Sequence, residues 1–157
     1  MKDILKCALY TVLVLGAVFS IYGVPGPPPM VHAAPLQNAM PVCDTSTPVS
    51  SASSVQVITA GSALNFIYVC GYNFGSIAGS SFSIVEGGGT VCATNTLAMD
   101  GGTTAAAGIG LAANGTVNFG SGSGMILKTK VPGDNVCIIM SGTGPLAGAM
   151  TWTSANF

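Results

Sequence analysis

The chain has 157 residues, of which four are basic and five are acidic, giving a formal net charge of −1. Only 6% of the residues are charged, against roughly 25% in an ordinary soluble domain, yet 49% are hydrophobic. This combination excludes a disordered chain, which pairs low hydrophobicity with high net charge. It also argues against nucleic-acid binding, which needs many phosphate contacts, because Lys128 and Lys130 are the only basic side chains after residue 33.

Residues 1–33 have the features of a secretory signal peptide. Lys2 and Lys6 form a basic start, an apolar run follows at 7–24, and Ala33 ends a small-residue cleavage site. An uncleaved membrane anchor is the alternative, since about 18 apolar residues just span a bilayer. Both interpretations place the rest of the chain outside the cytoplasm, as a secreted, periplasmic or cell-surface domain.

Export leaves four cysteines in the mature chain: Cys43, Cys70, Cys92 and Cys137. An even number in an exported domain predicts two disulfides. A zinc site is disfavoured, because no pair has CxxC spacing and no histidine follows residue 32. Three pairings are open, and we favour Cys70–Cys92 with Cys43–Cys137, which would hold one local loop and tie the N-terminal segment to a late strand.

The mature chain is expected to begin with a Pro/Ser/Thr-rich linker at 34–54 and to continue as one domain at 55–157. The segment at 65–74, NFIYVCGYNF, is the clearest strand, and its aromatic and β-branched residues make both faces mostly apolar. A two-residue period puts Phe66, Tyr68, Cys70 and Tyr72 on one face, and Ile67, Val69 and Gly71 on the other.

Further strands are expected at 55–59, 82–86, 116–120, 125–131, 136–140 and 149–157. The turn at 75–80 should join the strand at 65–74 to its hairpin partner, and Asn114-Gly115 is a second hairpin signal. Glycines at 101–113 disfavour a helix there. About eight short strands with turns between them predict an antiparallel β-sandwich of jelly-roll or immunoglobulin-like kind.

Several short motifs carry a resemblance: YVCGY at 68–72, VCATN at 91–95, LKT at 127–129, NVCII at 135–139 and a final strand with a tryptophan. With them, the chain from about Cys43 onward resembles a loosely defined set of small exported four-cysteine β-sandwich proteins encoded in bacterial and phage genomes. The segment at 85–92, VEGGGTVC, departs from the YGTG-like turn of that set. The resemblance implies a surface or virion component, and no catalytic residue is carried over.

The candidates for chemistry are few. Without a histidine after residue 32, the chain lacks Ser-His-Asp and Cys-His sites. A glycosidase needs two carboxylates facing each other, and the mature chain offers Asp44, Glu86, Asp100 and Asp134, two of them in turns. Lys128 and Lys130 are expected on a solvated strand face rather than in a serine–lysine dyad. We therefore expect no catalytic residue, no metal site and no cofactor.

Tyr68, Tyr72 and Trp152 are the candidates for stacking on a sugar ring, although aromatic residues in a sandwich more often fill its core. The sequence predicts a non-catalytic exported structural or adhesive component of a cell surface or virion, with a small carbohydrate-binding module as the alternative. We expect self-association or docking through uncharged sheet surface, with the uncharged segment at 149–157 as an edge strand. No nucleic-acid partner is expected, and a membrane is contacted only through an uncleaved leader.

Overall fold

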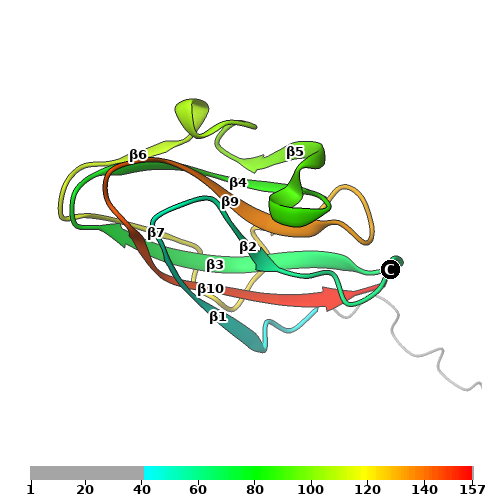
Figure 1. The fold of residues 1–157 in the computed structure, drawn as a ribbon. Helices are drawn as coiled ribbons and strands as arrows, with labels where there is room; N and C mark the ends of the chain where they lie inside the picture. Colours follow the sequence, from blue (N-terminus) through cyan, green and yellow to red (C-terminus); the bar gives the residue numbers. More distant parts are fainter. Residues whose placement is uncertain (1–40, 157) are drawn as a thin grey trace, which may run out of the picture. The chain divides into compact units, whose positions relative to one another are not determined.

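The computed structural model describes residues 41–156, which form two antiparallel β-sheets packed as a sandwich (Figure 1). The first sheet contains β1 (Thr45–Ser51), β10 (Leu146–Ala155), β3 (Phe66–Ser76), β7 (Gly115–Phe119) and β8 (Leu127–Lys128). The second contains β2 (Val55–Ile58), β9 (Asn135–Gly142), β4 (Ser80–Gly88), β5 (Thr94–Asp100) and β6 (Ile109–Leu111). Two 3₁₀ turns, η1 (Thr90–Cys92) and η2 (Ala105–Ala107), complete the described elements.

The strands follow the order β1-β10-β3-β7 in the first sheet, where β8 shares the β7 edge of β3. The second sheet has the order β2-β9-β4-β5, where β6 shares the β5 edge of β4. The strand predicted as the clearest, β3, therefore lies inside its sheet and is paired along both edges. Its apolar faces are explained by this position, because the core covers one face and neighbouring segments cover part of the other.

A β-bulge at Cys70 divides β3 into two halves with opposite phase. Val69 pairs with Trp152 and Gly71 pairs with Thr151, so Cys70 is an extra residue in the ladder. The core cluster consequently contains Ile67 and Val69 before the bulge and Tyr72 and Phe74 after it. The uninterrupted alternation predicted for this strand is wrong beyond Cys70.

The core lies between the sheets and contains Phe74, Phe82, Ile84, Ile138, Leu146 and Met150, each with no more than 2% of its surface exposed. Phe74 from the first sheet and Phe82 from the second meet edge to face, with ring centroids 5.4 Å apart. Such a contact adds a preferred geometry to the free energy gained by burying two aromatic rings.

Consecutive strands mostly lie in different sheets. The turn at 77–79 leads from β3 in the first sheet to β4 in the second, and the two strands do not pair. The Asn114-Gly115 turn likewise leads from β6 to β7 across the sandwich, with Asn114 at a φ of 59°. Both segments are turns as expected, but the hairpins predicted there are wrong.

Three further expectations concern the ends of the chain. Part of the predicted linker is strand β1, which pairs with β10 along its length. The final strand, β10, is longer than expected and lies between β1 and β3, so its prediction as an edge strand is wrong. The predicted leader at 1–33 and the first linker residues, 34–40, lie outside the described part. Within residues 41–156, no helix is long and apolar enough to cross a membrane.

The four cysteines of the described residues form two disulfides, but with a pairing other than the one favoured from the sequence. Cys43, just before β1, is bonded to Cys70 at the β3 bulge, and Cys92 in η1 is bonded to Cys137 in β9. The favoured Cys70–Cys92 bridge is wrong because Cys70 lies in β3 of the first sheet, whereas Cys92 lies in η1 and packs against β4 and β9 of the second sheet. Two disulfides are typical of an oxidising, extracytoplasmic environment.

Candidate functional site

The three aromatic candidates from the sequence are largely enclosed. Tyr72 is 3% exposed in the core, and Tyr68 is 4% exposed with the Lys128 ammonium 5.3 Å from its ring centroid. Trp152 is half-buried, packs against the core and donates its indole N–H to Thr47 Oγ1 at 2.9 Å. A sugar ring stacks on an exposed aromatic face, and Tyr72 and Tyr68 expose too little surface for this.

Tyr72 instead joins the two sheets. Its hydroxyl group donates a hydrogen bond of 2.6 Å to Asp100 Oδ2 at the end of β5, while Asp100 Oδ1 accepts the backbone N–H of Gly101. Burial, reinforced by the carboxylate of Asp100, raises the pKa of Tyr72 well above its usual value of 10.0. The phenol therefore remains a neutral donor, and Asp100 has a structural role on both oxygens.

Glu86 is the most deeply buried ionisable group among the described residues, with 0% of its surface exposed. Its Oε2 accepts the backbone N–H groups of Lys130 at 2.5 Å and Val131 at 3.4 Å. Its Oε1 and Asp134 Oδ2 are buried without a hydrogen-bond partner in the structure. Desolvation raises the pKa of Glu86, the two N–H groups lower it, and the negative charge of Asp134 raises it.

This arrangement fastens the segment between β8 and β9 to the second sheet. The same segment is tied to the first sheet, where Thr129 Oγ1 accepts the Ile67 N–H at 3.0 Å and the Gly133 N–H reaches the Asn65 carbonyl at 2.8 Å. No group of three or more His, Cys, Asp or Glu side chains within 41–156 is placed to hold a metal ion. Glu86 is thus a buried hydrogen-bond acceptor that holds this segment to the second sheet.

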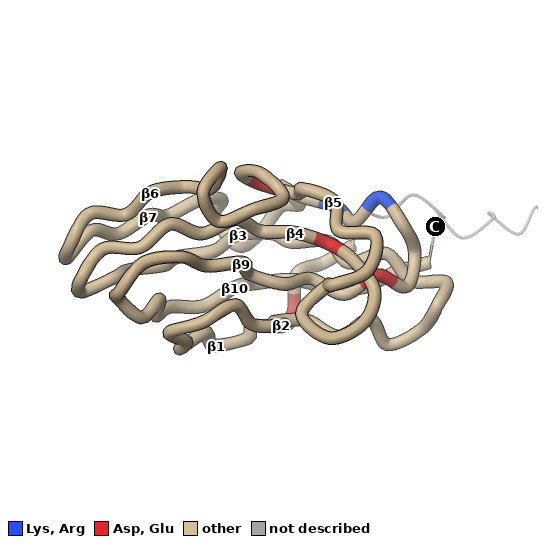
Figure 2. Tube along the Cα trace, turned by 45° about the horizontal axis from the view of Figure 1, so that its top comes forward, with Lys and Arg blue, Asp and Glu red and all other residues tan. Residues whose placement is uncertain are grey.

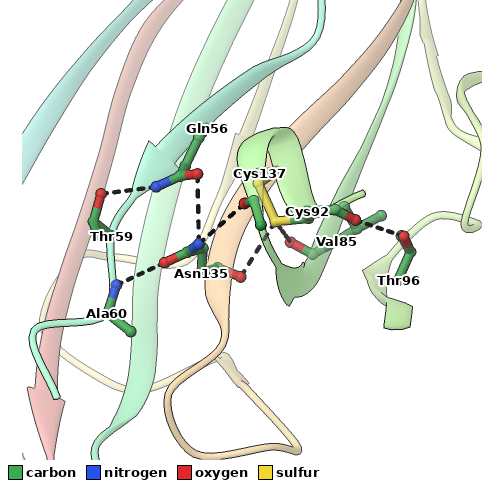
Figure 3. Close-up of a disulfide and its surroundings, with 9 residues drawn as sticks. Gln56, Thr59, Ala60, Val85, Cys92, Thr96, Asn135 and Cys137 are labelled. Carbon is green, nitrogen blue, oxygen red and sulfur yellow. Dashed lines mark hydrogen bonds between the residues drawn. A yellow bond between two sulfur atoms is a disulfide. The ribbon is translucent and has the colours of Figure 1, made fainter. Parts of the chain in front are cut away.

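The outer face of the second sheet is partly covered by its own loops. η1 packs there through the Cys92–Cys137 disulfide, which forms a small cluster with Val85 and Ile139. Asn135 holds η1 beside β2 by donating to the Gly89 carbonyl at 3.3 Å and accepting the Ala60 N–H at 3.0 Å (Figure 3). η2 is held by Ser83, whose hydroxyl donates to the Thr104 carbonyl at 2.9 Å.

The outer face of the first sheet carries an open hollow along β3. Because Tyr72 and Phe74 point into the core, the residues between and beside them, Gly71, Asn73 and Gly75, face outward. We call this feature the β3 groove. Its floor is the exposed Asn73 and the half-buried Gly75, and it is closed at one end where residues 119–122 bury Gly71. Thr116 and Asn118 of β7 form one wall, and Ala149 and Thr151 of β10 form the other. It comprises two adjoining hollows of about 280 and 400 Å³, which Asn73 and Asn118 both line.

The β3 groove is polar and uncharged. Asn73 and Asn118 are exposed, and Asn73 Oδ1 accepts the Ala149 N–H at 2.9 Å, which fixes its amide group with the NH₂ available to a ligand. Thr151 Oγ1 donates to the Gly71 carbonyl at 3.2 Å, so this wall is also held in place. Figure 2 shows the charged residues gathered toward one half of the described chain, and none of them lines the groove.

No protein-family model, no curated protein and no solved structure matches this chain. The candidate site is therefore argued from its own residues.

Sequence reasoning did not find the groove. Under a continuous two-residue period, Asn73 falls on the same face as Ile67 and Val69, and thus in the core. The signal available was Gly71, since an isolated glycine within a strand often marks a bulge. A bulge there reverses the phase and turns Asn73 outward.

Proposed function

We propose that this chain is a non-catalytic, exported structural or adhesive component of a cell surface or virion. The observation that carries the proposal is the β3 groove on the first sheet's outer face, which is lined by small, uncharged residues. A domain that stays alone in solution usually protects its sheets with charge. A neutral groove of this kind suits lasting contact with another surface.

We further infer that the sandwich is a jelly roll. Its support is the order β1-β10-β3-β7 facing β2-β9-β4-β5. The last strand, β10, lies beside the first, and β1 to β4 alternate between the two sheets. An immunoglobulin-like sandwich begins with two strands in the same sheet, whereas β1 and β2 lie in different sheets. Jelly rolls serve as capsid and lectin domains, which agrees with a surface role.

The absence of catalysis is part of this proposal. Asp100 is engaged by Tyr72 and Gly101, and Glu86 by the backbone of Lys130 and Val131. A general acid or base must reach a substrate proton, and Glu86 is not exposed at all. Two disulfides and the predicted leader support export.

The proposal is tested by attachment and association of the exported protein. We expect it to sediment as an oligomer, or to copurify with the surface or virion of its producing cells. Asn118→Lys should weaken this contact, because it places an ammonium group on the open face and burying an unpaired charge is costly. Ala106→Lys, at an exposed position of η2 beside the second sheet, is the matched control. A strict monomer that binds neither surface nor virion would contradict the proposal.

The alternative, a small carbohydrate-binding module, is favoured by one observation. The exposed amides of Asn73 and Asn118 converge on the β3 groove, and such groups hydrogen-bond sugar hydroxyls. The two functions differ in whether the chain is itself part of an assembled surface.

A further inference from the structure

We infer that the β3 groove binds a neutral glycan chain lying along the strand. The inference rests on the proposed adhesive function and names the ligand class of its contact face. Two adjoining hollows follow β3 between β7 and β10 and share Asn73 and Asn118, and the groove is closed at Gly71 by residues 119–122. An elongated ligand is therefore favoured over a compact one.

The lining selects a neutral, hydroxyl-rich ligand. Side-chain amides at Asn73 and Asn118 offer both donors and acceptors, and Thr116 adds an exposed hydroxyl. An anionic ligand would need a basic partner, but the lysines of the described chain are elsewhere: Lys128 lies over the Phe66 ring and Lys130 donates to the Ala98 carbonyl. A lipid or other apolar ligand would leave the amides unpaired.

The position of β3 disfavours a peptide. An extended peptide commonly binds by adding a strand to a sheet edge, where free backbone groups are available. β3 is paired with β10 on one side and with β7 and β8 on the other, so its ladder offers no edge. Its face is available only to a ligand that is recognised by side chains and by close approach to glycine.

Gly75 makes that approach feasible. At Gly75 a Cβ atom would lie 3.3 Å from Thr116 Cγ2, so any side chain there would fill the hollow beside Thr116. Gly75 has no positive φ, and substitution is not strained by the backbone. Gly75→Val should therefore close the groove while keeping the strand. Gly110→Val in β6 is its matched control, because a Cβ at Gly110 meets nothing within 4 Å.

The experiment is native-gel affinity electrophoresis of the purified protein in soluble starch, dextran and β-glucan, with alginate as an acidic comparison. We expect at least one neutral polysaccharide to retard the wild type, and the matching oligosaccharide to shift the amide NMR signals of Asn73, Gly75 and Asn118. Gly75→Val should abolish the retardation, and Gly110→Val should retain it. Asn118→Ala, an exposed change that spares the fold, should weaken binding about tenfold through lost hydrogen bonds.

Each contrary result has a distinct meaning. Retardation by alginate alone, by no neutral polysaccharide, or equally in Gly75→Val and the wild type overturns the glycan inference. If Gly75→Val abolishes self-association while no glycan binds, the occupant is a second copy of the chain, so the inference fails and the surface role stands. Glycan binding by a monomer that attaches to no surface would instead support the inference and contradict the structural function.

Discussion

At Glu86, burial and hydrogen bonding act on one carboxyl group in opposite directions. Desolvation is the larger effect and raises its pKa above the usual value of 4.5, and the nearby Asp134, whose own pKa is raised by desolvation, acts in the same sense. Between pH 4.5 and the raised native pKa, the native state therefore holds a proton that the unfolded chain releases. The contribution of Glu86 to the free energy of unfolding is fully present below pH 4.5 and decreases as the pH rises toward the native pKa.

We predict that Glu86→Gln stabilises the domain at neutral pH. The amide oxygen can still accept the Lys130 and Val131 N–H groups, while the group no longer ionises in a buried site. The free energy of unfolding should increase by on the order of 1 kcal/mol at pH 7 and change little at pH 4. Urea unfolding measured from pH 4 to pH 8 checks this.

The matched control is Glu86→Ala, which removes the acceptor. It should destabilise the domain at every pH by about 1–3 kcal/mol, because two partly buried N–H groups lose their partner. If Glu86→Gln were as destabilising as Glu86→Ala at pH 7, ionised Glu86 would be contributing favourably, and the direction assigned to its pKa would be wrong.

Among the elements, the two disulfides hold different parts of the sandwich. Cys92–Cys137 spans 45 residues and lies in a fully buried cluster under η1, where Val91 and Cys92 both have a φ of 53°. A valine in this left-handed region is strained. Cys43–Cys70 spans 27 residues and joins the segment before β1 to β3.

We predict that replacing Cys92 and Cys137 by serine costs more stability than replacing Cys43 and Cys70. Each bridge should contribute about 2–4 kcal/mol, and the longer loop adds about half a kcal/mol to the first. Loss of the buried packing around Val85 and Ile139 should widen the difference. Urea midpoints of the two double variants, measured without reductant, decide the order. A difference of only about half a kcal/mol would show that η1 contributes nothing beyond chain closure, and equal midpoints would contradict the predicted order.

Most individual strands could be predicted from the sequence, because apolar alternation and turn residues are local signals. β2, β3, β4, β7, β9 and β10 all lie where these signals place them. The pairing of the strands was not predictable. The turns before β4 and β7 contain residues that favour a hairpin, but the same residues also serve where the chain crosses to the other sheet. β1 was missed because its polar residues TSTPVSS carry almost no apolar pattern.

The candidate site shows the same limit. The sequence directed attention to Tyr68, Tyr72 and Trp152. In the structure the two tyrosines are buried and Trp152 is half-buried against the core. Asn73 and Asn118 are distant in the chain and become neighbours only through the pairing of β3 with β7. Their outward direction further depends on the bulge at Cys70, so neither composition nor spacing could place them together.

Over the whole molecule, the described chain carries few charges, and Figure 2 shows them away from one half of the sandwich. Contacts made by the neutral face should therefore be nearly independent of salt. We predict that self-association or surface attachment changes less than about threefold between roughly 0.05 M and 0.5 M NaCl. Sedimentation or binding assays across this range test it, and a tenfold weakening would show that charge pairs carry the contact.

The Cys43–Cys70 bridge also determines how the domain would bear mechanical load. β1 is the outermost strand of the first sheet, and a pull on the chain before it would ordinarily peel it from β10, one hydrogen bond after another. With Cys43 bonded to Cys70, the force bypasses β1 and enters the sheet at β3, which is held on both sides. Many hydrogen bonds between β3 and its neighbours must then break at the same time. A domain tethered through its N-terminal segment would thus resist tearing for as long as this one bond stays oxidised.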